Sequence, residues 1–141
     1  MKILAACAAF LCPTLAIAGD IIITDAFVPL APKGVMAHAA YMEVTNTGET
    51  IRSMIGVKAP DYAMAHIHQS MEKDGVATMM SMHQLDIKPG QTVVLEPGGL
   101  HVMLMKPVAP LETGGSVALE VQFANGETIP VTATVVKPNG S

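Results

Sequence analysis

The sequence predicts an all-β domain, a sandwich or barrel of short strands, and three observations support this class. Short runs rich in β-branched and aliphatic residues recur roughly every eight to twelve residues. Tight-turn sequences such as Lys73-Asp74-Gly75 and Asn125-Gly126 separate these runs, and Asp, Asn and Gly tolerate the positive φ that such turns need. No segment combines a 3.6-residue hydrophobic period with helix caps, so we expect little helix.

The expected strands are the β-type runs that end at turn residues. They cover residues 21–28, 39–46, 51–57, 63–69, 77–82, 91–95, 101–105, 116–123 and 129–136. The segments that separate most of them are rich in Gly, Pro, Asn and Asp: 29–34, 46–48, 73–75, 88–90, 96–99, 113–115 and 125–126. The last pair of runs, joined through Asn125-Gly126, is the clearest β-hairpin.

Residues 1–18 read as a signal peptide. Lys2 supplies the positive end, an apolar stretch follows, and Ala16-Ile17-Ala18 is a small-x-small cleavage site. The apolar stretch is short and interrupted by Pro13, so we expect no stable membrane insertion. Removal leaves residues 19–141 as a single exported domain. A lipoprotein is the alternative, because Leu4-Ala5-Ala6-Cys7 resembles the sequence before a lipidated cysteine.

Composition excludes several classes of function. The only two cysteines, Cys7 and Cys12, lie in the signal segment, so the mature chain has neither a disulfide nor a thiolate ligand. Loss of Lys2 moves the formal charge of −4 to −5, which argues against nucleic acid or an anionic membrane as partner. The chain has eleven methionines but only two tyrosines, three phenylalanines and no tryptophan. Methionine can fill a core or bind a soft metal, and composition alone does not separate these roles.

The candidate metal ligands are His68, Met79, His101 and Met103, separated in order by ten, twenty-one and one residues. His101 and Met103 are two apart, so a strand directs both side chains to one face. Thioether and imidazole donors together select Cu(I) over hard ions. All the ligands are neutral, which favours Cu(I) over Cu(II), and the absence of thiolate lets a thiol-bearing acceptor take the ion. The set predicts a carrier of one Cu(I) ion and not an enzyme.

These residues also carry a family resemblance. The segment Ala65-His66-Ile67-His68-Gln69, Met79, and the segment 96–105 together hold the pattern His-x10-Met-x21-His-x-Met. In this pattern, and over nearly the whole mature chain, the sequence resembles the periplasmic copper chaperone family PCu(A)C. The resemblance implies a cupredoxin-like Greek-key β-sandwich in the periplasm. It also implies one Cu(I) site near one end of the sandwich and a role in assembling the dinuclear copper centre of cytochrome c oxidase.

The same resemblance implies copper donor and acceptor proteins as partners, either the copper-bearing subunit of the oxidase or another periplasmic copper carrier, and we expect a monomer. The chain departs from the family beside the first ligand. Family members often have a carboxylate where this chain has His66, and Glu is frequent where it has Gln69. These changes can alter how the ligand histidines are oriented.

Further donors leave alternatives open. His66 shares a strand face with His68 and could bind Cu(II) at a secondary site, while Met105 could be a lid or another sulfur donor. We expect His83 to be exposed, and His38 to be an exposed loop histidine, with a weak second site beside Met36 and Met42 as the alternative. Other methionines are expected to fill the core or shield the site: Met54, Met64, Met71 and either Met80 or Met82.

Other functions fit the sequence less well. An electron-transfer cupredoxin needs a Cys ligand that the mature chain lacks. An enzyme needs a nucleophile and base, or paired carboxylates, and no such arrangement is recognisable. A periplasmic copper storage or resistance protein and a metal-free β-sandwich interaction domain remain as alternatives to the carrier.

Overall fold

The structure, a computed structural model, describes residues 19–138. The predicted signal peptide, with Cys7 and Cys12, lies outside that range. The described part of the chain forms strands and no helix, so it also contains no helix that could cross a membrane. The strands are β1 (Ile21–Pro29), β2 (Ala37–Asn46), β3 (Arg52–Lys58), β4 (Tyr62–Lys73), β5 (Val76–Met82), β6 (Leu85–Ile87), β7 (Thr92–Leu95), β8 (Leu100–Pro107), β9 (Ser116–Phe123) and β10 (Thr128–Val136).

The predicted all-β class is confirmed, and each of the nine expected runs is a strand. Most boundaries agree within two residues. The run expected at 63–69 continues to Lys73, because its pairing with β5 runs up to the turn. Strand β6 was not predicted, since its three residues are too few to show the alternation that identifies a strand.

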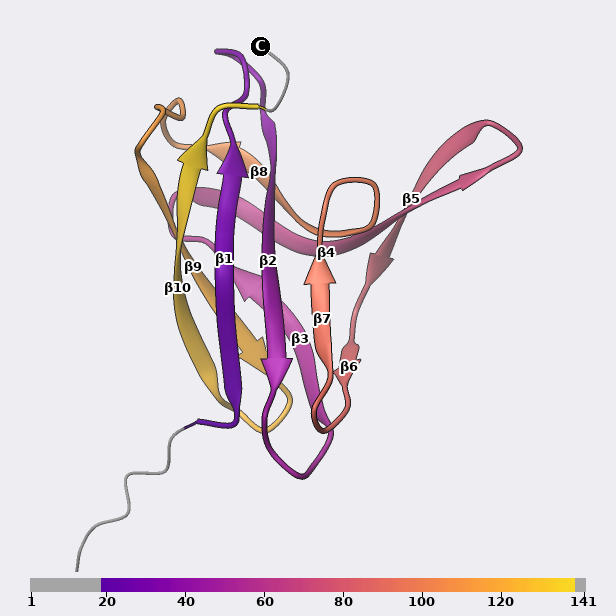
Figure 1. The fold of residues 1–141 in the computed structure, drawn as a ribbon. Coiled ribbons are helices and arrows are strands. Elements are labelled where there is room, and N and C mark those ends of the chain that lie inside the picture. The colour runs from indigo at the N-terminus through magenta and orange to yellow at the C-terminus, as the bar shows by residue number, and fades with distance from the viewer. Residues whose placement is uncertain (1–18, 139–141) are drawn as a thin grey trace, which may run out of the picture.

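The strands form two packed layers that share β2. Hydrogen bonds connect them in the order β5-β4-β8-β2-β1-β10-β9-β3-β6, with β7 paired to β2. Along one edge β2 pairs with β1; along the other, residues 37–40 pair with β8 and residues 42–45 with β7. Figure 1 shows β4 and β8 running across behind the upright β1, β2 and β10. Because neighbouring strands are mostly not consecutive in the chain, the sandwich has the crossover connections of a Greek key.

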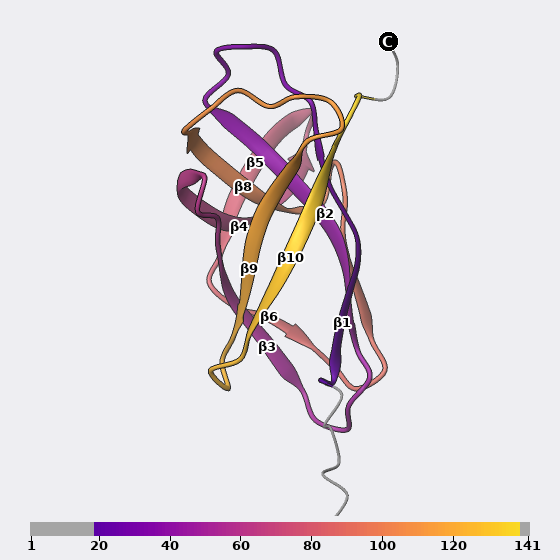
Figure 2. The ribbon, with the colours of Figure 1, turned by 90° about the vertical axis from the view of Figure 1, so that its left-hand side faces the viewer.

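Strands β1 and β10 form the parallel pair of the sandwich, aligned from Phe27 opposite Thr134 to Pro29 opposite Val136. Figure 2, turned by 90°, shows these strands side by side with β9. The pair ties the beginning of the described chain to its end. The hairpin predicted at Asn125-Gly126 is confirmed, because β9 and β10 pair in antiparallel register from Gln122 opposite Thr128 onward.

One apolar core lies between the two layers. Strand alternation directs its members inward; on β8, for example, Val102 and Leu104 are fully buried. Methionine supplies part of this core, since Met42 and Met54 are completely buried. The largest fully buried side chains are Phe123, Met42, Met54, Ile87, Leu95, Leu104 and Leu119.

Buried polar groups in the lower part of the sandwich have partners. The Asn46 amide donates to the carbonyls of Thr50 and Ile87, at 2.7 and 2.8 Å, and its oxygen accepts from the Gly48 amide at 3.0 Å. The buried Arg52 guanidinium forms ion pairs with Glu127 and with Asp20. It also lies 5.3 Å from the ring centroid of Phe123. These contacts link the surface residues at the end of the sandwich where β1 begins to the apolar core.

His38 lies in a different environment from the one the sequence suggested. It belongs to β2 and is 7% exposed, so the expectation of an exposed loop histidine is wrong. Its Nδ1 is hydrogen-bonded to the Tyr62 hydroxyl at 2.9 Å, and the rings meet edge to face. Burial lowers the pKa of His38, and burial raises the pKa of Tyr62 to about 12 with a smaller contribution from Asp61. Both side chains are therefore uncharged at neutral pH, and they form a hydrogen bond within the core.

Candidate metal centre

Strands β4 and β8 bring the predicted histidine ligands together. Their antiparallel register places His68 directly opposite His101. The two ring centroids are 5.9 Å apart, with the ring planes at 64°. Met103 lies two residues along β8 and opposite His66. Because the alternating residues Ile67, Val102 and Leu104 are buried in the core, the donors lie on the opposite face of this layer.

A two-residue turn places Met79. Asp74 and Gly75 have φ of 54° and 76°, the positive values of the turn that suits a hairpin with a right-handed twist. This turn pairs Lys73 with Val76 and sets the register of the whole hairpin. As a result Ser70 lies opposite Met79, and His68 lies opposite Ser81. Met79 therefore shares a face with His68, diagonally across the β4–β5 pair.

Three of the four predicted ligands line one hollow of about 310 Å³. Its wall is formed by Met79, His101 and Met103 together with Ala37, His38, Ala39, Tyr41, Ser70 and Gly98. Ala39 lies directly opposite Met103 in the β2–β8 pair. The small alanine side chains leave space beside the methionine. His68 does not line this hollow, but it lies directly opposite His101, which does.

Hydrogen bonds determine which ring nitrogens are left for a metal. The Nδ1–H of His101 donates to the Gly99 carbonyl at 3.1 Å, which leaves Nε2 to bind a metal. In His68, Nε2 lies 3.2 Å from Ser81 Oγ, and Nδ1 is buried without a hydrogen-bond partner among the described residues. If Nε2–H donates to Ser81, no buried N–H is left unpaired and Nδ1 carries a free lone pair.

The surroundings keep His68 in the form that binds metals. Burial lowers the pKa of His68 below 6.5, and positive charge on His101 and on His66 lowers it further. At neutral pH the imidazole is uncharged and its lone pair is available. A buried nitrogen without a partner among the described residues, on a side chain opposite His101 and on the same face as Met79 and Met103, fits a soft cation such as Cu(I).

The structure also shows supporting residues that the sequence analysis did not single out. Ser81 and Gly99 orient the two histidines, as second partners of metal-binding imidazoles commonly do. The sequence did contain a signal for Ser81, because it lies two residues after Met79 on the same strand and therefore on the same face. Gly99 belongs to the turn before β8, and its contact depends on the loop conformation.

The remaining donors are distributed over different surroundings. His83 is exposed, as predicted, and Met54 lies in the core. Met82 packs against the core, whereas Met80 is exposed. Met71 is also exposed, so a core role for it is wrong. It belongs to the β4–β5 hairpin, which projects from the sandwich as an arm in Figure 1. Within residues 19–138, no three His, Cys, Asp or Glu side chains gather into a metal-binding group. A site with three or more ligands around these histidines would therefore have to include thioethers.

Comparisons with solved structures identify the fold. The apo PCuAC domain from PmoF1 superposes with a TM-score of 0.72 at 21% identity, covering 85% of this chain and 96% of that domain. The copper-bound PCuAC domain from PmoF2 has the same TM-score at 22% identity, covering 85% and 95%. CuI-DR1885 from Deinococcus radiodurans is 31% identical, with a TM-score of 0.66 over 81% of this chain and 76% of that one. The expected PCu(A)C-type β-sandwich is confirmed.

Sequence comparison identifies the family. The curated protein "Putative lipoprotein Lxx21020" from Leifsonia xyli subsp. xyli is 32% identical over 120 residues, covering 84% of this chain and 71% of that protein. A family model described as "Putative lipoprotein LpqE-like" matches residues 21–135, nearly the whole described range. Over residues 21–135, from β1 into β10, this chain belongs to the LpqE-like family, and its fold is the β-sandwich of the PCuAC domains.

Proposed function

We propose that this protein is a copper chaperone that binds one Cu(I) ion through His68, Met79, His101 and Met103. The observation that carries the proposal is the convergence of these donors. Register places His68 against His101, and the other two ligands line the same hollow as His101. The buried Nδ1 of His68 has no hydrogen-bond partner within residues 19–138. The names of two structural relatives, CuI-DR1885 and the copper-bound domain from PmoF2, state that those proteins bind copper.

Carriage to another protein follows from the donor set and its exposure. Without a thiolate, the ion is exchangeable with an acceptor that offers cysteine. Met79 is 60% exposed and lies on the projecting β4–β5 arm. An acceptor can replace this ligand first, while His68 and His101 still hold the ion. We propose the dinuclear copper centre of cytochrome c oxidase as the destination, on the PCu(A)C resemblance alone.

We propose export to the periplasm through residues 1–18 and a single domain at 19–141. The matched family and the Leifsonia protein are both named as lipoproteins, which supports export and keeps lipidation at Cys7 open. The mass of the protein recovered from cells separates the two: cleavage after Ala18 gives a chain that begins at Gly19, and lipidation gives a heavier chain that begins at an acylated Cys7.

The test of binding is an anaerobic Cu(I) titration of residues 19–141 against a chromophoric Cu(I) chelator. We expect one tight equivalent, which His101→Ala abolishes. Failure of the protein to compete with the chelator would return it to the metal-free interaction class. Several equivalents of equal affinity would favour copper storage. Transfer is tested separately, by measuring copper in a thiolate-bearing oxidase domain after mixing and separation.

A further inference from the structure

The paired strands β4 and β8, called the ladder below, carry the His68 and His101 of the candidate centre. A second set of soft donors lies further along the same face of this ladder. In the β4–β8 register, Met64 lies directly opposite Met105, one step beyond the pair of His66 and Met103. Met64 is 38% exposed, His66 is exposed and Met105 is half-buried. None of the three belongs to the buried core, because the other face of the same two strands supplies it.

The geometry allows these donors to meet. Side chains directly opposite on an antiparallel pair have Cβ atoms about 4.5–5.5 Å apart, and diagonal neighbours are within reach of long side chains. Met64 and Met105 form such a direct pair, and His66 is diagonal to Met105. The His66 ring stacks on His68 at 6.3 Å between centroids, with the planes 20° apart. The ladder therefore places one imidazole beside two flexible thioethers.

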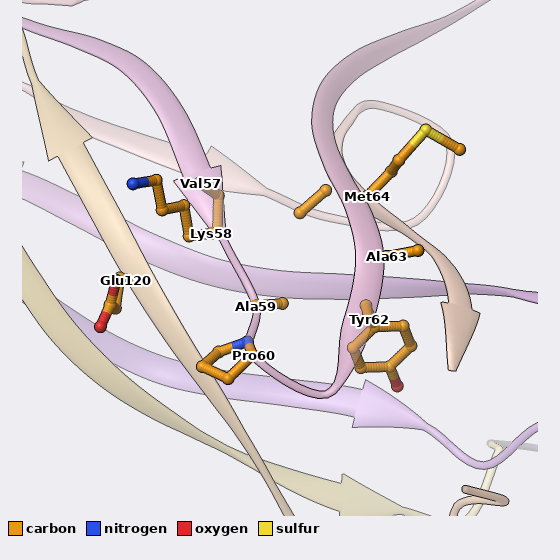
Figure 3. Close-up of a pocket in the computed structure, with 9 residues that line it drawn as sticks. Val57, Lys58, Ala59, Pro60, Tyr62, Ala63, Met64 and Glu120 are labelled. Atoms are coloured by element: carbon orange, nitrogen blue, oxygen red, sulfur yellow. The ribbon is translucent and has the colours of Figure 1, made fainter. Parts of the chain in front are cut away.

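The outer end of this ladder is exposed. Met64 belongs to the residues that line a hollow of about 310 Å³ between the end of β3 and the start of β4. Figure 3 shows its side chain extending from β4 away from Lys58 and Glu120, on the other side of that hollow. Two of the residues that line this hollow, Pro60 and Ala63, are exposed. Because Met64 itself is 38% exposed, an ion or a donor protein can reach it without passing through the core. The inner end of the ladder adjoins Met103, a proposed ligand of the first centre.

We propose that Met64, His66 and Met105 form a second Cu(I) site, next to the one bound by His68, Met79, His101 and Met103. Two thioethers and one imidazole make a neutral three-donor set that suits Cu(I) and not hard divalent ions. The site is filled second, because it has one ligand fewer and lies beside an ion that is already positive. Repulsion between the two charges makes its affinity at least roughly tenfold lower. The proposal rests on the copper chemistry of the proposed function, but on different ligands.

The experiment is a Cu(I) titration of residues 19–141, followed by chelator competition and by NMR of the methionine methyl groups. We expect two equivalents, a tight one and a weaker one. The methyl signals of Met64 and Met105 shift only with the second. In the double variant Met64→Leu/Met105→Leu we expect the second equivalent to be lost and the first to keep its affinity. The matched control is Met71→Leu/Met80→Leu, which changes two exposed methionines outside the ladder and keeps both equivalents.

The outcomes separate this site from the first one. Loss of the tight equivalent in His101→Ala, with shifts of the Met64 and Met105 methyls retained, supports both assignments. A single equivalent in the unchanged protein, with these two methyl signals unmoved, overturns the second site and leaves the first. A second equivalent that survives in Met64→Leu/Met105→Leu also overturns it. If no copper binds at all, both the second site and the proposed function fail.

Discussion

The imidazole rings of His68 and His101 lie opposite each other across the β4–β8 pair, with their centroids 5.9 Å apart and their planes at 64°. Each ring has one nitrogen held by a neighbour, Ser81 for His68 and the Gly99 carbonyl for His101. The orientation of both rings is thereby set without a metal. Binding a cation between such side chains requires little reorganisation, which favours affinity.

Removal of one ligand should weaken copper binding without unfolding the protein. In His68→Ala and in Met103→Ala we expect the Cu(I) affinity to fall by about 100-fold or more, since even changes to residues that only support ligands cost about 10–100-fold. Both side chains are only partly buried, so the loss in unfolding free energy should stay near 1 kcal/mol. Chelator competition and urea unfolding measure the two quantities. The exposed His83 provides the control variant, His83→Ala; unchanged affinity in both ligand variants would sink the assignment.

Neighbouring methionines on β5 should differ sharply in copper binding. Met79 shares the face of His68, whereas Met80 lies opposite Gln69 on the other face of the hairpin. Their exposures are similar, 60% and 52%, so neither truncation should change stability by more than about 0.5 kcal/mol. We expect Met79→Ala to weaken Cu(I) binding by at least roughly tenfold and Met80→Ala to leave it unchanged. Equal effects from the two variants would show that the arm, and not one thioether, contributes.

The buried Tyr62 should make the fold sensitive to alkali. Burial, with a smaller contribution from Asp61, raises its pKa from 10.0 to about 12, so the folded chain keeps the phenol proton after the unfolded chain has lost it. This contribution to stability is complete below pH 10 and is lost as the pH rises towards about 12. Urea unfolding at several pH values measures the loss.

The matched variants separate Tyr62 from Tyr41, whose pKa burial also raises. We expect Tyr62→Phe to lose less stability between pH 10 and pH 12 than the unchanged protein does, and Tyr41→Phe/Tyr62→Phe to lose still less. At neutral pH, Tyr62→Phe should cost about 1 kcal/mol, because Nδ1 of His38 loses its partner. If the stability of Tyr62→Phe fell as steeply at alkaline pH as that of the unchanged protein, Tyr62 would not be the group responsible.

Arg52 should be important for stability and unimportant for copper. Its buried guanidinium pairs with Glu127 and Asp20 and lies over Phe123, at the end of the sandwich where β1 begins. Since the two carboxylates are partly exposed, we expect Arg52→Ala to lower the unfolding free energy by about 1–3 kcal/mol, less than for a fully buried pair. Lys58→Ala, at an exposed cation, should change it by less than about 0.5 kcal/mol. If Arg52→Ala changed the Cu(I) affinity while the fold stayed intact, the candidate copper site would not be independent of the Arg52 ion pairs.

The sequence was most informative where local rules apply. Alternation predicted that His101 and Met103 share a face, and the Asp74-Gly75 turn signal marked the hairpin that carries Met79. It was least informative where the environment comes from distant strands. His38 follows a turn-rich segment and was expected in a loop, yet β2 begins at Ala37 and directs His38 to Tyr62, twenty-four residues away.

By itself, the sequence determined the types of the candidate donors, their spacing and the side of each strand on which they lie, because side-chain alternation depends only on the local backbone. Only the tertiary structure decided that β4 pairs with β8, that His68 therefore meets His101, and that Met64 and Met105 extend the same ladder. Strand partners are chosen by burial of the whole core, and a shift of one residue in register would move every donor to the wrong face. That choice is made by residues such as Ile67, Val102 and Leu104, which bind no metal.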